Sequence, residues 1–284
     1  MVIAHNEPDQ EEIAMVKDFQ KTHPNKLKHI IFDKVTPLGF SWNKCIQSAT
    51  GDFLTIWNID DQRTNNSIEL QAKKLEDNRL IDVVYGNYKV VDKFGSLSGK
   101  LIEHKNIPLE EFSRSMVWGP FFMFRKSMLS KTGLFDEQFR SALDFDFCVR
   151  TSFHAKAKYI SENLGWFLSA QQGLSTNPNS PNDFERTAIE LRYGIYDKID
   201  YTKITCITKY NLSSILFNNR WYTVETFIPD YKKFLENRKN HLLHKGLMKF
   251  TTFYIKKYGI IAKIKRSLKK CLGMLYENNR TYGS

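Results

Sequence analysis

Short apolar runs alternate with amphipathic segments along the first 150 residues of the chain. The apolar runs have the length and composition of β-strands, and they cover residues 1–5, 28–34, 52–59 and 81–92. The segments between them carry apolar residues at the spacing of a helix face, and they cover residues 8–23, 43–49 and 67–78. This alternation predicts an α/β layer fold, in which helices cover a sheet.

The pattern changes in the second half of the chain. Residues 117–129 change from a strand pattern to a helix pattern, and residues 142–155 predict a helix with acids in its first turn. Residues 171–183 are rich in Asn, Ser and Pro and predict a loop, and residues 184–240 predict mainly helix. We therefore expect a main domain at residues 1–180, a helical extension at 181–240 and a C-terminal tail at 241–284.

The net charge of +11 over 284 residues is concentrated in one segment. Residues 245–270 carry nine Lys or Arg and no acid, whereas the rest of the chain has 33 basic against 31 acidic residues. The body is therefore close to neutral, and no nucleic-acid partner is expected from its charge. The segment also predicts an amphipathic helix, which would lie on an anionic membrane surface or pack on the body with its lysines in solvent.

The cysteine pattern bears on the compartment. The four cysteines form no CxxC pair and stand far apart, at Cys45, Cys148, Cys206 and Cys271. They predict free thiols of a reducing compartment rather than a zinc site or a disulfide framework. The sequence shows no signal-peptide pattern and no run of 18 apolar residues. We expect a cytoplasmic location, with peripheral binding of the basic tail to the inner face of the membrane as a variant of it.

Polar side chains gather at the end of the third predicted strand. The stretch LTIWNIDDQR leads from apolar residues straight into Asn58, Asp60 and Asp61. Two adjacent acids repel each other unless a positive group lies nearby, and hard divalent ions take oxygen ligands. Because ligands of α/β sheets bind at the carboxyl ends of strands, these residues are candidates for a Mg²⁺ or Mn²⁺ site. The alternative is a solvated turn in which Asp61 caps the next helix.

A second acidic pair, Asp144 and Asp146, opens the predicted helix at residues 142–155. Positions i and i+2 of a helix point to different faces, so we expect the two acids to have different roles. Asp146 and Arg150 are one turn apart and predict a structural pair. One of the two acids would then face a cleft while the other pairs or caps the helix.

Four segments, taken in their order along the chain, resemble family-2 glycosyltransferases of the GT-A fold. They are GFSWN (39–43), ATGDFLTIWNIDD (49–61), GLFDEQF (133–139) and LDFDFCVR (143–150). The resemblance covers about residues 1–180. It implies a Rossmann-like α/β fold whose central sheet is mostly parallel and flanked by helices, with a helical C-terminal extension. It also implies the inverting transfer of a sugar from a nucleotide-diphosphate donor to a hydroxyl of a glycan or a lipid-linked acceptor.

The resemblance implies roles for individual residues. Asp60 would be the metal ligand, for Mg²⁺ or Mn²⁺, and Asp144 would be the base that deprotonates the acceptor. Donor contacts would come from Asn6, Asn43, Lys44, Asn58, Asp61 and Arg63. Trp118 and Gly119 would form an acceptor-side wall, because sugars stack on aromatic faces; the alternative for Trp118 is a core position.

The chain departs from the family pattern at several positions. Asn58 replaces the first Asp of the metal motif, Leu143 replaces a Glu before the base, and Trp42 stands where an Arg is common. Spacing to GFSWN makes MVIAHNEPD similar to the second strand of the family, so its central first strand would lie before Met1 and leave a hole between its neighbours. The rival register makes MVIAHNE the first strand and then has one element too few.

Two other classes of function stay open. The substitutions at Asn58 and Leu143 would suit a degenerate, non-catalytic binding subunit of the same fold. The basic tail would suit a membrane-binding or nucleic-acid-binding protein, although the tail alone shows no groove with interleaved aromatic residues.

Overall fold

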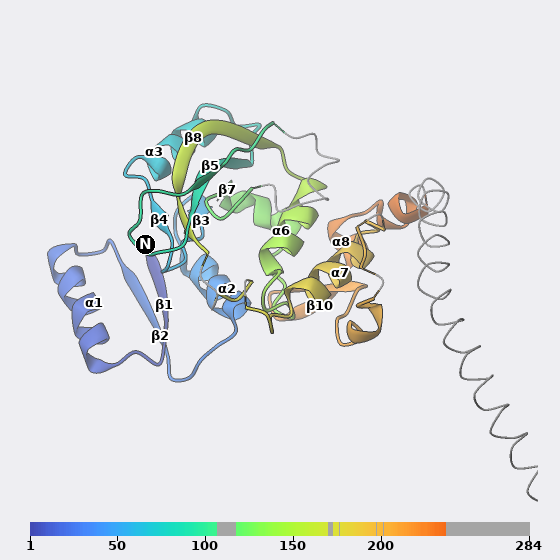
Figure 1. Ribbon diagram of the computed structural model, residues 1–284, viewed down its shortest axis with the longest axis horizontal. Helices are drawn as coiled ribbons and strands as arrows, with labels where there is room; N and C mark the ends of the chain where they lie inside the picture. Colours follow the sequence, from blue (N-terminus) through green and yellow to red (C-terminus); the bar gives the residue numbers. More distant parts are fainter. Residues whose placement is uncertain (107–117, 170–172, 176, 197, 201, 237–284) are drawn as a thin grey trace, which may run out of the picture. The chain divides into compact units, whose positions relative to one another are not determined.

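The structure is a computed structural model that describes residues 1–106, 118–169, 173–175, 177–196, 198–200 and 202–236 (Figure 1). Residues 1–232 form one unit and residues 233–284 form another. The predicted basic segment at residues 245–270 lies outside the described residues. Among the described helices, none is both long enough and apolar enough to cross a membrane.

The chain begins with a small β-α-β unit that matches the predicted elements. Strand β1 (Val2–Asn6) pairs in parallel with β2 (Lys28–Phe32), and helix α1 (Gln10–Thr22) connects them (Figure 1). The helix begins with a capping box, in which the Asp9 carboxylate accepts from the Glu12 backbone N–H at 2.8 Å and the Glu12 carboxylate accepts from the Asp9 N–H at 2.9 Å. No residue of α1 is buried. Local capping, rather than core packing, therefore defines this helix.

The main sheet has the order β3-β7-β5-β8-β4. Strand β6 also pairs with β5, further along β5 than the residues that pair with β7. Its strands are β3 (Phe53–Thr55), β4 (Gln62–Arg63), β5 (Val83–Val91), β6 (Lys100–Ile102), β7 (Met123–Arg125) and β8 (Ala157–Leu168). Only β5 and β8 run parallel among the described strands of this sheet, and the other pairs are antiparallel. The sheet is therefore mixed, and the prediction of a mostly parallel sheet was wrong in this detail. Helix α6 (Leu143–Ser152) crosses between β5 and β8, which is what a parallel pair requires.

The sequence pattern did not predict several of the strands. Strand β8 is twelve residues long, but its ladder with β5 slips twice near Asn87, so the alternation of inward and outward residues is broken. The predicted helical extension contains α7 (Asn182–Arg192) and α8 (Val224–Phe227), and also a hairpin of β9 (Ser214–Phe217) and β10 (Arg220–Thr223). The region is therefore less helical than predicted.

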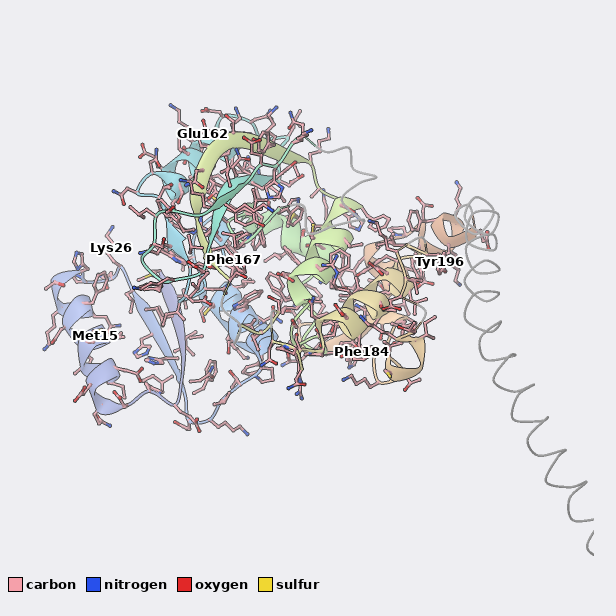
Figure 2. The ribbon with its side chains drawn as sticks, in the orientation of Figure 1. Met15, Lys26, Glu162, Phe167, Phe184 and Tyr196 are labelled. Atoms are coloured by element: carbon pink, nitrogen blue, oxygen red, sulfur yellow. The ribbon has the colours of Figure 1, made fainter. Side chains whose placement is uncertain are left out.

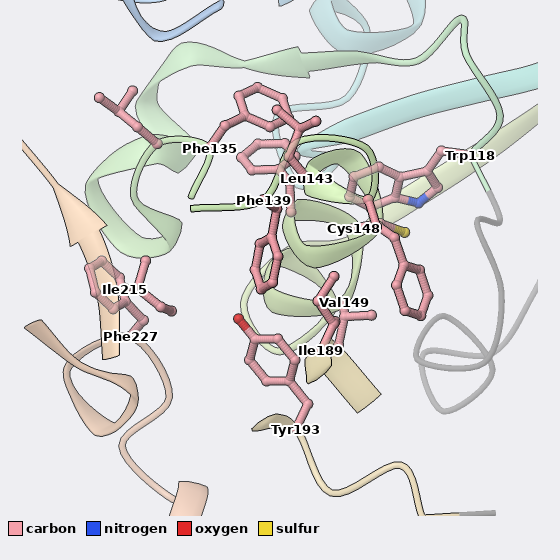
Figure 3. Close-up of a cluster of buried hydrophobic side chains, with 14 of the residues drawn as sticks. Trp118, Phe135, Phe139, Leu143, Cys148, Val149, Ile189, Tyr193, Ile215 and Phe227 are labelled. Carbon is pink, nitrogen blue, oxygen red and sulfur yellow. The ribbon is translucent and has the colours of Figure 1, made fainter. Parts of the chain in front are cut away.

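Helices α2 (Leu38–Ser48) and α3 (Ser67–Glu76) both form where helices were predicted, and α2 begins five residues earlier than expected. The core lies around α6 and is rich in aromatic side chains, several of which appear in Figure 3. The rings of Phe135 and Phe147 are stacked with centroids 4.4 Å apart. Figure 2 shows how densely the side chains fill the space around the main sheet and α6. This packing makes α6 a rigid support.

Charged side chains are buried in the same core, where α6 meets α7. Asp146 accepts from Arg150 Nη2 at 2.8 Å, from Arg192 Nη1 at 2.8 Å and from the Tyr193 hydroxyl at 3.0 Å. Arg192 also bonds to Asp136 at 2.9 Å. All four charged side chains have no solvent exposure. We call Asp136, Asp146, Arg150 and Arg192 the buried ion cluster; the predicted pair of Asp146 and Arg150 is part of it.

Removing one member of the buried ion cluster would leave the others without compensation. We expect Arg192→Met to lower the free energy of unfolding by about 3–5 kcal/mol, because Asp136 and Asp146 would share one remaining cation in a dry environment. Urea denaturation followed by circular dichroism measures this loss. The control is Lys21→Met, which removes a surface pair with Asp18 and should cost less than about 1 kcal/mol. Equal stability of the two variants would contradict the role given to the cluster.

Candidate functional site

A cleft of about 2730 Å³ runs along β1, β3, the loop after β3, α2 and the start of α6. Strand β1 pairs with β2 and β3 pairs with β7, and within the described residues neither strand has a partner on its other edge. Both strands contribute residues to the cleft wall, and α2 packs on β1. The cleft is therefore bordered by two rows of unpaired backbone groups.

The two carboxylates of the loop after β3 have different environments: Asp60 is exposed to the cleft and Asp61 is buried. Asp60 is exposed, lines the cleft and has no hydrogen bond or ion pair among the described residues. Asp61 is 5% exposed, and its carboxylate accepts from the Leu168 N–H at 3.2 Å and from Asn58 Nδ2 at 3.3 Å. Burial raises the pKa of Asp61 to about 6. Asp61 thus ties the loop to the end of β8 and does not cap the next helix.

The Arg63 side chain supports the end of β3. Its Nη1 donates to Gln71 Oε1 at 3.1 Å, and its Nη2 donates to Thr55 Oγ1 at 2.5 Å and to the Ile56 carbonyl at 3.2 Å. Its guanidinium also contacts the rings of Trp57 and Phe121. Burial lowers the pKa of Arg63 to about 10. With these contacts Arg63 supports the loop, and its contact with a donor phosphate stays a prediction.

Asp144 reaches the cleft from the first turn of α6. Its Oδ1 accepts from the Phe145 N–H at 2.7 Å, so it helps to satisfy the free backbone groups at the helix start while still lining the cleft. Burial raises the pKa of Asp144 to about 6, and the nearby Arg186 opposes that rise. The carboxylate is therefore ionised at neutral pH but binds a proton more readily than an exposed Asp.

Glu185 of α7 holds the segment that leads into α6. Its carboxylate accepts from the backbone N–H groups of Arg140, Ser141 and Ala142 at 2.7 to 2.8 Å, and it is fully buried. The Tyr210 hydroxyl donates to it at 3.2 Å. Sequence reasoning missed this residue, because Glu185 is 41 positions from Asp144 and looks like an ordinary acid in the first turn of a helix. It is the residue that positions the start of α6 beneath Asp144.

Three of the predicted contact residues are directed away from the cleft. Asn43 is buried, and its amide bonds to the backbone of Phe135 and to Glu137 at 2.9 to 3.0 Å, which fixes the turn of the third segment. Lys44 lies over the Phe40 ring, with 5.2 Å between Nζ and the ring centroid. Trp118 is 1% exposed and packs in the core, as Figure 3 shows. The core position is therefore the correct reading of Trp118.

The other predicted residues meet at the cleft. Gly119 lines it with φ of 63°, and a Cβ atom at this position would lie 2.6 Å from the Tyr88 ring. Asn6 also lines it, with its Oδ1 accepting from the Thr36 N–H and hydroxyl. The predicted residues that the structure brings together on the cleft wall are Asn6, Asn58, Asp60, Asp61, Arg63, Gly119 and Asp144.

The residues of the loop fit a divalent ion that is completed by a ligand. No group of three or more His, Cys, Asp or Glu residues could hold a metal within the described part of the chain. The Asp60 carboxylate is nevertheless free to bind a ligand. The side-chain oxygen Oδ1 of Asn58, whose Nδ2 donates to Asp61, is a second oxygen donor. Mg²⁺ commonly takes one or two protein carboxylates together with substrate phosphates. The donor set therefore suits a metal that binds with a diphosphate and is weak without it.

Comparison with known proteins shows which proteins the chain is similar to. The model for glycosyl transferase family 2 matches residues 1–133. An uncharacterised glycosyltransferase of Methanocaldococcus jannaschii is 26% identical over 157 residues, which are 53% of this chain and 52% of the relative. The chain thus spans about half the length of the curated relative that it matches.

Solved structures of TarS from S. aureus have a similar fold at low sequence identity. The complex of TarS 1–349 with UDP has a TM-score of 0.52 at 15% identity, and the match covers 72% of this chain and 58% of that TarS chain. The complex of TarS 1–349 with UDP-GlcNAc has a TM-score of 0.54 at 17% identity, and the match covers 72% of this chain and 59% of that TarS chain. The resemblance inferred from the four sequence segments is confirmed: residues 1–133 match the model of glycosyl transferase family 2, and the chain has the GT-A fold.

Proposed function

We propose that the chain is an enzyme that transfers a sugar from a nucleotide-diphosphate donor to a hydroxyl group of a glycan or a lipid-linked acceptor. The observation that carries the proposal is that Asp60 and Asp144, from elements far apart in the sequence, line one cleft with carboxylates that no basic side chain neutralises by an ion pair within the described residues. UDP and UDP-GlcNAc bound to TarS support a nucleotide-sugar donor.

Asp60, with the Asn58 carbonyl oxygen, would hold a Mg²⁺ or Mn²⁺ ion together with the donor diphosphate. When bound, such an ion supplies positive charge that stabilises the departing diphosphate. The protein contributes a fixed loop, because Asp61 and Arg63 tie the end of β3 to β8 and to α3. This division explains why only one of the two adjacent acids remains available to a ligand.

Asp144 would act as the base. Its carboxylate takes the proton of the acceptor hydroxyl while the acceptor oxygen bonds to the anomeric carbon of the donor. The bond between that carbon and the diphosphate breaks on the opposite side, and its electrons leave with the nucleoside diphosphate. A single displacement of this kind inverts the configuration at the anomeric carbon. Burial of Asp144 favours proton uptake without making the group neutral at pH 7.

A binding subunit without catalysis is the second candidate. Asn58 carries no charge and the Asp61 carboxylate is engaged with Leu168 and Asn58, so Asp60 is left as the one unspent carboxylate of the described loop. Such a protein would bind a nucleotide but would not turn over a nucleotide sugar. The predicted membrane contact of the basic tail stays a prediction beside both candidates.

Nucleotide binding tests the donor site. We expect calorimetry with UDP and GDP to show binding that Mn²⁺ strengthens, and Asp60→Asn to weaken the Mn²⁺-dependent binding roughly tenfold to a hundredfold, because a metal contact is lost. The control is Asp52→Asn, an exposed acid outside the cleft that should leave the affinity unchanged. Nucleotide binding that ignores both Mn²⁺ and Asp60→Asn would refute the site.

The pH dependence of turnover tests the base. A base must be ionised, and the pKa of Asp144 is about 6, so we expect the rate of sugar transfer, or of donor hydrolysis, to rise as the pH passes through about 6 and then to level off. Asp144→Asn should lower this rate by about 10² to 10⁴ and keep UDP affinity. Asp183→Asn, a surface acid paired with Lys203, is the matched control. An unchanged rate and acid limb in Asp144→Asn would exclude Asp144 as the base.

A further inference from the structure

One cation on the cleft wall has no role in the proposed chemistry. Arg186 of α7 is half-buried, lines the cleft together with Asp144 and stacks on the ring of Phe145, with 4.1 Å between its guanidinium carbon and the ring centroid. Phe145 directly follows Asp144 on α6, and Figure 1 shows α7 beside α6. The stacking therefore fixes the guanidinium next to the base.

The N–H groups of the Arg186 guanidinium are available to a ligand. Within the described residues its side chain forms no hydrogen bond and has no carboxylate within 4.0 Å, which sets it apart from the paired Arg150 and Arg192. The neighbouring carboxylate of Glu185 is unavailable, because it is bound to three backbone N–H groups and to a tyrosine hydroxyl. Asp144 influences Arg186 only through space, without an ion pair.

A second guanidinium group lies on the same stretch of wall. Arg140 is exposed at the cleft, its backbone is held by Glu185, and its side chain has no ion pair among the described residues. Asn182 and Ser141 line the same cleft, and the Ser141 hydroxyl donates to Asn182 Oδ1 at 3.5 Å. The part of the cleft around Asp144 thus offers several hydrogen-bond donors and two positive charges.

We propose that Arg186, with Arg140, binds an anionic group on the acceptor, a phosphate or a carboxylate close to the hydroxyl that is glycosylated. The inference rests on the proposed function, since an acceptor hydroxyl within reach of Asp144 brings its neighbouring atoms to Arg186. A guanidinium is planar and matches the two oxygens of a carboxylate or phosphate with two parallel hydrogen bonds. The acceptor is therefore an acidic molecule, and Arg186 is the residue that selects it.

Direct binding of inorganic phosphate tests the anion site without catalysis. The full chain is titrated with phosphate by calorimetry in EDTA, so that a divalent ion does not contribute. We expect wild-type protein to bind phosphate and Arg186→Met to bind it about tenfold to a hundredfold more weakly, which corresponds to the loss of hydrogen bonds to a charged group. Arg220→Met, an exposed arginine on β10 outside the cleft, should keep the wild-type affinity.

The overturning results are equally direct. Phosphate affinity that is the same in Arg186→Met and wild type, or no phosphate binding by folded wild-type protein, would reject the site. A circular dichroism melt of each variant shows whether it is folded, and Arg186→Lys, which keeps the charge but not the planar fork, should recover part of the affinity. These readings are independent of UDP binding, so a failure of the donor site and a failure of the anion site are separate observations.

Matched acceptors then test selection during transfer. Glycerol, glycerol phosphate and glycerate share hydroxyl groups and differ in charge, and transfer from UDP-GlcNAc to each is followed by release of UDP. We expect the KM of at least one anionic acceptor to be roughly tenfold or more below that of glycerol, and this difference to vanish in Arg186→Met. The better of the two anions shows whether the site takes phosphate or carboxylate. Equal use of the three acceptors by wild-type protein would contradict the proposal.

Discussion

The buried ion cluster is the constraint on which the arrangement of the cleft depends. Asp136, Asp146, Arg150 and Arg192 carry two negative and two positive charges in a place without solvent, so each side chain needs its partners to offset the cost of leaving water. The bonds run from the turn after α5 (Leu129–Thr132) to α6, α7 and the Ser214 carbonyl at the start of β9. Asp144 lies two residues before Asp146, so the position of the proposed base follows from contacts inside the core.

The charges of the protein fall into two groups with different consequences. Those of the buried ion cluster are satisfied by one another, whereas those of Asp60, Asp144, Arg140 and Arg186 are left open at the cleft. Asp61 and Asp144 illustrate the difference, because burial raises the pKa of each to about 6, yet Asp61 is held by Leu168 and Asn58 while Asp144 still reaches the cleft. A perturbed pKa alone therefore does not distinguish a residue that supports a loop from one that is available to a ligand. The difference lies in whether the side chain is already bound within the loop or still reaches the cleft.

The sequence predicted the local features and missed the long-range ones. Helix α1 and the pair of Asp146 with Arg150 followed from residue spacing within a few positions. The mixed sheet and β8 did not, because their pairing joins residues far apart and its slip near Asn87 hides the period of two. Long-range contacts also explain the errors at individual residues. Asn43 was predicted to bind a ligand, but its amide bonds to the backbone of Phe135. Glu185 has no distinguishing pattern in the sequence, but its carboxylate binds the backbone of residues 140–142. Contacts of this kind are set by tertiary packing.

A crystal structure of the protein with UDP and Mn²⁺ is the most direct measurement, because manganese can be located by its anomalous scattering. The account predicts a manganese ion bound to Asp60 and to the diphosphate, with the nucleotide in the cleft and its terminal phosphate directed toward Asp144. A manganese ion bound without Asp60, or a nucleotide held outside the cleft that Asp60 and Asp144 line, would contradict the account.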